Sequence, residues 1–273
     1  MFEQSIFEPT VPDWLTGLWQ RLSIEENGQR DESTLVFWLQ THSCFGDIRI
    51  PANRPAIASF DAVDEKAAIA LSHQAGFSGI ARLQGDICQW ERALDYQPFT
   101  GVPDIGRLYW RGDLLVEEGT EENYVEEWKR VATGPTAAMV CAADTQWHRS
   151  LVICGDYFIF TVDERPTLPS ADSLTSLVIN QSVHRGSTLQ DLDHQALNCE
   201  ISMGRCQGGA QPWQIEHSTL PWREGRSLWT HTKGRRSHFS IDPTANQVVQ
   251  SDGSRLLQWT VYEWGKLAEL LPG

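Results

Sequence analysis

Three extended stretches in the middle of the chain decide its fold: GDICQWERALDYQP at 85–98, DIGRLYWRGDLLVEEGT at 104–120 and NYVEEWKRV at 123–131. Large aromatic and apolar side chains recur in them with charged ones between, and glycine-containing turns separate them. This pattern is typical of consecutive β-strands joined by short turns. We therefore predict an antiparallel meander with strands at about 86–94, 105–111, 113–118 and 123–131.

The same signals extend the meander toward the N-terminus. STLVFWLQT at 33–41 is apolar on both of its alternating faces, which favours a central strand. Further strands are predicted at about 18–25, 47–50 and 77–83. The stretch DAVDEKAAIALSHQ at 61–74 has helical character, with Ser59 or Asp61 as its cap and Gly76 as its stop.

The second half of the chain alternates short apolar runs with turn residues, which predicts more β-structure. The expected strands lie at about 137–142, 150–154, 157–162, 196–203, 212–218, 226–232, 236–241, 246–250 and 255–263. A short helix is expected at about 171–181 and a helical turn near the C-terminus. Gly134-Pro135 suggests a boundary. We expect a β-barrel unit over 1–134 and a second β-rich unit over 135–273 that packs on the first or completes it.

Composition excludes several classes of partner. The net charge is −14, from 36 acidic and 22 basic residues, so nucleic acid and anionic membranes are not expected partners. The start MFEQSIFEPT lacks the basic and apolar regions of a secretory signal, which predicts a cytoplasmic protein. The one basic stretch, near Lys233 and Arg236, is interpreted as a solvated turn, with an anion-binding loop as the alternative.

No cofactor or metal is expected from sequence motifs. The six cysteines form no C-x-x-C pair and are interpreted as reduced, mostly buried thiols. Glycine-rich phosphate or dinucleotide loops and nucleophile turns are absent from the sequence. Two histidines and two aspartates gather between 184 and 194, where a polar loop and a mixed nitrogen–oxygen metal site are the two interpretations.

Two resemblances then refine the fold. Gly17-Leu18-Trp19 resembles the G-x-W signature of lipocalins and the wider calycin group, in which the tryptophan closes one end of an antiparallel barrel and the mouth takes a small apolar ligand. The helix at 61–74 departs from that group, whose helix follows the last strand. Further segments look similar to an uncharacterised bacterial family of lipocalin-like proteins: FWLQT (37–41), DIRIP (47–51), GFSG (76–79), ICQWERALDYQP (87–98), EEG (117–119) and YVEEW (124–128).

Together these observations predict a mostly β protein with an antiparallel lipocalin-like barrel, or two, and one or two short helices. The resemblance implies a cavity and supplies no activity. Residues two apart on a strand share a face, so polar and aromatic pairs on neighbouring strands can meet inside the barrel. The candidate ligand-binding residues chosen on this basis are Trp38, Asp47, Arg49, Trp90, Arg92, Tyr109, Glu126 and Trp128.

Three functions remain open at this level. The first is binding of a small, partly apolar anionic molecule, with Arg49 and Arg92 on its charge and the aromatic residues along the walls. The second is an isomerase or hydrolase on a calycin-type scaffold, with Glu126 or Asp47 as acid or base. The third is a structural protein, in which the charged pairs Asp47–Arg49 and Arg92–Glu126 are ordinary salt bridges. The sequence also leaves a homodimer open.

A related question is whether Glu117, Glu118 or Glu126 could serve in acid–base catalysis. These glutamates lie in or beside an acid-rich segment, EEGTEEN at 117–123. Such runs usually lie on a solvated surface. We therefore expect Glu117, Glu118 and Glu126 to be exposed.

Overall fold

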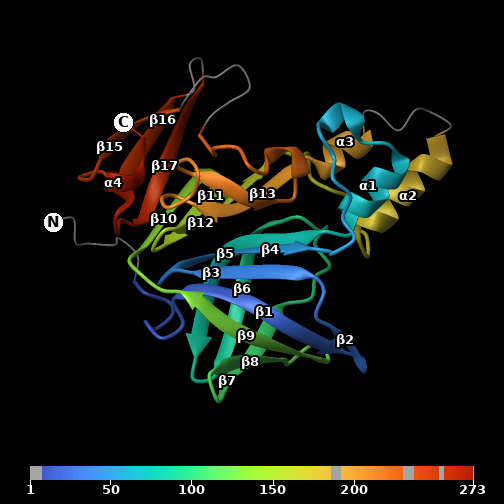
Figure 1. Cartoon of the computed structure of the whole chain (residues 1–273), viewed down its shortest axis with the longest axis horizontal. Helices are drawn as coiled ribbons and strands as arrows, with labels where there is room; N and C mark the ends of the chain where they lie inside the picture. The colour runs from blue at the N-terminus through green and yellow to red at the C-terminus, as the bar shows by residue number, and fades with distance from the viewer. Residues whose placement is uncertain (1–7, 186–191, 230–236, 252–254, 273) are drawn as a thin grey trace.

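A computed structural model describes residues 8–185, 192–229, 237–251 and 255–272, and over 180–185 and 192–194 it describes the backbone alone. Strands make up 51% of the chain and helices 11%, so the expected mostly β, antiparallel fold class is confirmed. Four short α-helices occur in the described part, compared with the one or two expected. Figure 1 shows two β-sheets packed on each other, with most of the helical structure gathered at one end.

The first sheet is a closed antiparallel barrel of eight strands. Its strands are β1 (Gly17–Glu26), β3 (Leu35–Gln40), β4 (Cys44–Ile50), β5 (Ala75–Gln84), β6 (Ile87–Asp95), β7 (Asp104–Arg111), β8 (Leu114–Gly119) and β9 (Tyr124–Ala132). Each strand pairs with the next in the chain, apart from the short β2 (Gln29–Asp31), which pairs only with β1. The pairing of β9 with β1 closes the barrel and leaves no long exposed edge.

The second sheet also has eight antiparallel strands, in the order β14-β13-β12-β11-β10-β17-β16-β15. Its strands are β10 (Thr136–Ala143), β11 (Gln146–Cys154), β12 (Tyr157–Asp163), β13 (Cys199–Arg205), β14 (Gln214–Ser218), β15 (His238–Asp242), β16 (Gln247–Ser251) and β17 (Leu256–Glu263). The prediction of a strand at 226–232 is wrong for residues 226–229, because Ser227 makes only an isolated bridge to Gln214 there. Residues 230–232 lie outside the described part.

The helices interrupt the two meanders. They are α1 (Glu65–Ser72), α2 (Leu174–Arg185), α3 (Leu192–Leu197) and α4 (Leu267–Leu270), with 3-10 turns η1 (Phe60–Ala62) and η2 (Pro221–Arg223). Helix α1 lies between β4 and β5 of the barrel, and α2 and α3 lie between β12 and β13 of the second sheet. All three come together beside the sheets (Figure 1).

The core has three parts that follow from this packing. One lies inside the barrel around Trp38, one between the barrel and the second sheet around Ile48 and Ile159, and one on the far face of the second sheet around Trp259. Gly46 on β4 lies close to β12, since a Cβ there would meet Ile159 Cγ2 at 2.7 Å. Strand β3 contributes to the first two parts, as expected for a strand that is apolar on both faces.

Candidate functional site: a charged barrel end and the adjoining pocket

Aromatic rings occupy the middle of the barrel. Trp38 on β3 stacks on Trp19 of β1 with 6.0 Å between ring centroids. It also meets Trp90 of β6 and Trp128 of β9 edge-on, each at 5.6 Å. The structure therefore brings together three of the predicted wall residues, in contact with one another.

One end of the barrel is sealed by residues before β1. The Trp19 Nε1 group donates a hydrogen bond to the Leu15 carbonyl at 2.9 Å. The Arg130 guanidinium lies 4.9 Å from the Trp19 ring centroid and donates to the Trp14 carbonyl at 2.9 Å. An eight-stranded antiparallel barrel with Trp19 at a closed end is consistent with the lipocalin-like resemblance.

Charged side chains gather toward the other end of the barrel. Glu126 Oε1 on β9 accepts hydrogen bonds from Arg21 Nη1 at 2.6 Å and from Arg49 Nη1 at 3.5 Å. Arg49 Nε also donates to Asp47 Oδ1 at 2.9 Å, so the predicted Asp47–Arg49 contact is present. The Asp47 and Glu126 side chains are 2% exposed. Burying such charges is costly unless they are paired, and here they are.

Arg92 has different partners from the one predicted. It pairs with Asp104 Oδ2 at 2.7 Å and with Asp95 Oδ2 at 3.0 Å, so the Arg92–Glu126 salt bridge expected from the sequence is wrong. Its guanidinium lies 3.7 Å from the centroid of the Phe77 ring. A register shift between β5 and β6 accompanies this arrangement, and it carries Leu94 to the outer face of the barrel.

Glu117 is a member of this group that the sequence interpretation missed. It is 5% exposed and accepts a hydrogen bond from the Tyr124 hydroxyl at 2.8 Å, so the expected solvated position is wrong. Glu118 is exposed as expected, whereas Glu126, also expected to be exposed, is buried. Burial, followed by the nearby Glu126 and Asp104 carboxylates, raises the pKa of Glu117 well above its usual range. The closed barrel, rather than the local sequence, turns Glu117 inward.

We call these residues the charged cluster: Arg21, Asp47, Arg49, Arg92, Asp104, Glu117, Tyr124 and Glu126. Burial also raises the pKa of Asp47, against the opposing effect of Arg49. Two buried polar atoms beside the cluster have no hydrogen-bond partner in the described part of the chain: Glu126 Oε2 and Trp128 Nε1. The first is an acceptor and the second a donor.

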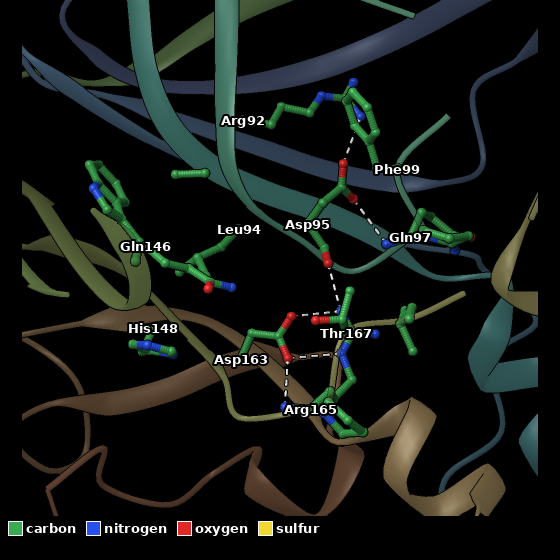
Figure 2. Close-up of a pocket in the computed structure, with 15 residues that line it drawn as sticks. Arg92, Leu94, Asp95, Gln97, Phe99, Gln146, His148, Asp163, Arg165 and Thr167 are labelled. Carbon is green, nitrogen blue, oxygen red and sulfur yellow. Dashed lines mark hydrogen bonds and ion pairs between the residues drawn. The ribbon is translucent and has the colours of Figure 1, made fainter. Parts of the chain in front are cut away.

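A pocket of about 250 Å³ adjoins the charged cluster between the barrel and the second sheet. We call it the interface pocket, and its wall includes Arg92, Asp95, Phe99, His148, Asp163 and Arg165. Figure 2 shows Arg92 and Phe99 at one edge, with Asp163 and Arg165 at the other. Arg92 and its partner Asp95 thus connect the charged cluster with this pocket.

Arg165 holds the floor of the interface pocket in place. Its Nε donates to Asp163 Oδ1 at 2.9 Å, and one Nη group donates to the Asp95 carbonyl at 2.6 Å (Figure 2). The other Nη group donates to the carbonyls of Tyr96 and Ala196, each at 2.9 Å. The side chain is 2% exposed. These contacts fasten the end of β6 to the loop after β12.

Tyr109, a predicted wall residue, does not line the barrel interior. It is 39% exposed and alternates along β7 with Leu108, which points inward.

Within the described residues no group of three or more histidine, cysteine, aspartate or glutamate side chains is arranged to hold a metal ion. The side chains of the 184–194 group lie outside the described residues, and so do Lys233 and Arg236. The six cysteines are unpaired, and only Cys141 is not fully buried.

Comparison with known proteins adds the fold alone. No family model and no curated protein matches this sequence. The structure is similar to the crystal structure of an uncharacterized protein from Saccharomyces cerevisiae, with a TM-score of 0.53 and 12% identity. The match covers 90% of this chain and 97% of the yeast chain, so it includes both sheets. No helix in the described ranges has the length and apolar character needed to cross a membrane.

Proposed function

We propose that this protein binds a small, partly apolar molecule in the interface pocket, with Arg92 as the central contact. The observation that carries the proposal is the position of Arg92, which belongs to both the buried charged cluster and the pocket wall. Phe99, Leu94 and Trp147 supply apolar wall, and the paired Arg92 and Asp95 supply polar contacts. Apolar walls with a few placed polar groups are typical of small-molecule sites.

Charge balance favours a neutral ligand over the anion predicted from the sequence. The charged cluster contains three arginines and four carboxyl groups, and each arginine is already paired with a carboxylate. In the interface pocket, Arg92 and Arg165 are likewise paired with Asp95 and Asp163. An incoming anion would compete with these carboxylates, whereas a hydroxyl or amide group would add hydrogen bonds without adding charge.

The proposal is tested by native mass spectrometry of the purified protein, followed by denaturation and analysis of released small molecules. We expect a stoichiometric neutral compound that is lost in Arg92→Ala. Arg82→Ala is the matched control, because Arg82 pairs with Glu91 and the two side chains are 54% and 43% exposed. Retention of the compound by Arg92→Ala contradicts the proposal. The proposal is also contradicted if the protein is purified without a bound compound and a panel of neutral metabolites does not change its melting temperature.

The raised pKa of Glu117 favours a second candidate function, general acid–base catalysis. Glu117 lies directly across from Glu126 in the β8–β9 pairing, and a carboxyl group that keeps its proton beside a second carboxyl group can act as an acid. A panel of chromogenic esters, phosphates and glycosides tests this function. We expect turnover that both Glu117→Gln and Glu126→Gln abolish, and turnover unchanged by either variant contradicts it.

A further inference from the structure

The second sheet carries a separate pocket that differs from the charged cluster in its charge balance. It has a volume of about 330 Å³ and lies where β11, β12 and β13 meet η2 and β16. Three arginines line it, Arg149, Arg223 and Arg255, together with two glutamates, Glu164 and Glu200. The balance is therefore one positive charge, on a chain whose net charge is −14.

Arg223 is held in place while keeping donor capacity. Arg223 Nε donates to Glu200 Oε1 at 2.9 Å and Nη2 donates to the Leu228 carbonyl at 3.3 Å. These contacts use two of the five N–H donors of a guanidinium and leave Nη1 unused within the described part of the chain. Arg149 and Arg255 both pair with the same oxygen, Glu164 Oε1. One carboxylate thus serves two guanidinium groups.

The remaining wall is mostly apolar and also includes the polar side chains of Asn198 and Gln250. Phe160 and Trp229 meet edge-on with 5.6 Å between their centroids, and Leu228 and Leu220 lie beside them in the lining. Trp229 is 3% exposed, and its Nε1 has no hydrogen-bond partner among the residues described. An orphaned buried donor is uncommon in a native structure.

We propose that this second-sheet pocket is a separate binding site for a small carboxylate or sulfonate carried on an aromatic or aliphatic body. The guanidinium of Arg223 binds the anionic group, with Arg149 adding a second positive charge, while Phe160 and Trp229 contact the apolar body. Charge-assisted hydrogen bonds to guanidinium favour an anion strongly. The volume lies near the lower end of the range of about 300–1,000 Å³ for small-molecule sites, so the ligand is small.

Titration calorimetry of the full chain with 2-naphthoate tests this site, with 2-naphthalenemethanol as the uncharged ligand of the same ring system. We expect one saturable naphthoate site and at least tenfold weaker binding of the alcohol. Arg223→Gln and Arg149→Gln should each weaken naphthoate binding about tenfold, through loss of one charged contact. Arg205→Gln is the matched control, because Arg205 pairs with Glu216 at 2.8 Å on the neighbouring strands and does not line the pocket.

Two further comparisons separate loss of the binding site from misfolding and from binding in the interface pocket. Because Arg149 and Arg223 lie on different elements, β11 and η2, misfolding of one variant, detected by its melting temperature, leaves the other as the test. Arg92→Ala should bind naphthoate normally, which separates this site from the interface pocket. The proposal is overturned by equal affinity for the acid and the alcohol, by unchanged binding in folded Arg149→Gln or Arg223→Gln, or by loss of binding in Arg92→Ala.

Discussion

At the scale of single residues, Glu117 and Glu126 face each other across β8 and β9 in different surroundings. Glu126 contacts Arg21, whose side chain is 5% exposed, whereas Glu117 contacts the Tyr124 hydroxyl. Burial raises the pKa of Glu117 well above its usual range and so favours its neutral, protonated form. Exchanging a neutral carboxyl for a neutral amide preserves the oxygen that accepts the tyrosine hydrogen bond.

We therefore expect Glu117→Gln to change the free energy of unfolding by less than about 1 kcal/mol. Glu126→Gln should cost about 3 kcal/mol, because it leaves the buried Arg21 guanidinium without its nearest carboxylate. Urea unfolding of both variants at pH 7 measures the difference. Equal losses in the two variants would show that Glu117 carries a structural charge.

At the scale of elements, helix α1 begins at a different residue from the one the sequence suggested. Asp64 has an extended backbone and its side chain accepts a hydrogen bond from the Ala67 amide at 2.8 Å, so it is the N-cap. Asp61, a predicted cap, lies in the 3-10 turn before the helix. Several acidic residues precede the apolar stripe of the helix. The backbone conformation before the helix decides which of them accepts the N-cap hydrogen bond.

Asp64→Ala should lower the free energy of unfolding by about 1 kcal/mol, the usual cost of losing an N-cap. Asp61→Ala should stay within about 0.5 kcal/mol of the unmodified protein, as a surface change does. Thermal unfolding followed by circular dichroism compares the two variants directly. A larger effect from Asp61→Ala would place the cap where the sequence suggested it.

At the scale of the whole molecule, Glu263 at the end of β17 fastens the β3–β4 turn of the barrel to the second sheet. It accepts hydrogen bonds from Thr41 Oγ1 at 2.5 Å, the Ser43 amide at 2.6 Å and Thr136 Oγ1 at 2.7 Å. His42 lies against it, with Nδ1 3.4 Å from Glu263 Oε2 and Nε2 3.0 Å from Asp13 Oδ1. The hydrogen bond with Glu263 is the main reason that the pKa of His42 rises to about 9.

This contact predicts a pH-dependent part of the stability. Because the folded pKa of His42 lies above its usual 6.5, the stabilisation is complete below pH 6.5 and is lost as pH rises through about 9. Screening at this partly exposed side chain limits the effect to the order of 1 kcal/mol. The free energy of unfolding should therefore fall more between pH 6 and pH 9.5 in the unmodified protein than in His42→Asn. Parallel pH profiles would count against the contact.

Much of the fold could be predicted from local sequence because β-structure has a two-residue period and its turns have characteristic residues. STLVFWLQT at 33–41 is apolar on both faces, and β3 is indeed covered on both. The first sheet ends with β9 and the second begins with β10, on either side of residues 134 and 135. That the two parts are separate folding units remains a prediction.

The candidate site could be predicted only in part. The sequence by itself determined which side chains share a strand face, and so it placed Asp47 with Arg49 and Trp38 among the interior aromatic residues. Tertiary structure alone decided the partners of Arg92, the burial of Glu117 and the outward direction of Tyr109. The physical reason is that strand periodicity is a local property. Closure of the barrel, a register shift between strands and the packing of a second sheet are set by contacts between residues far apart in the chain.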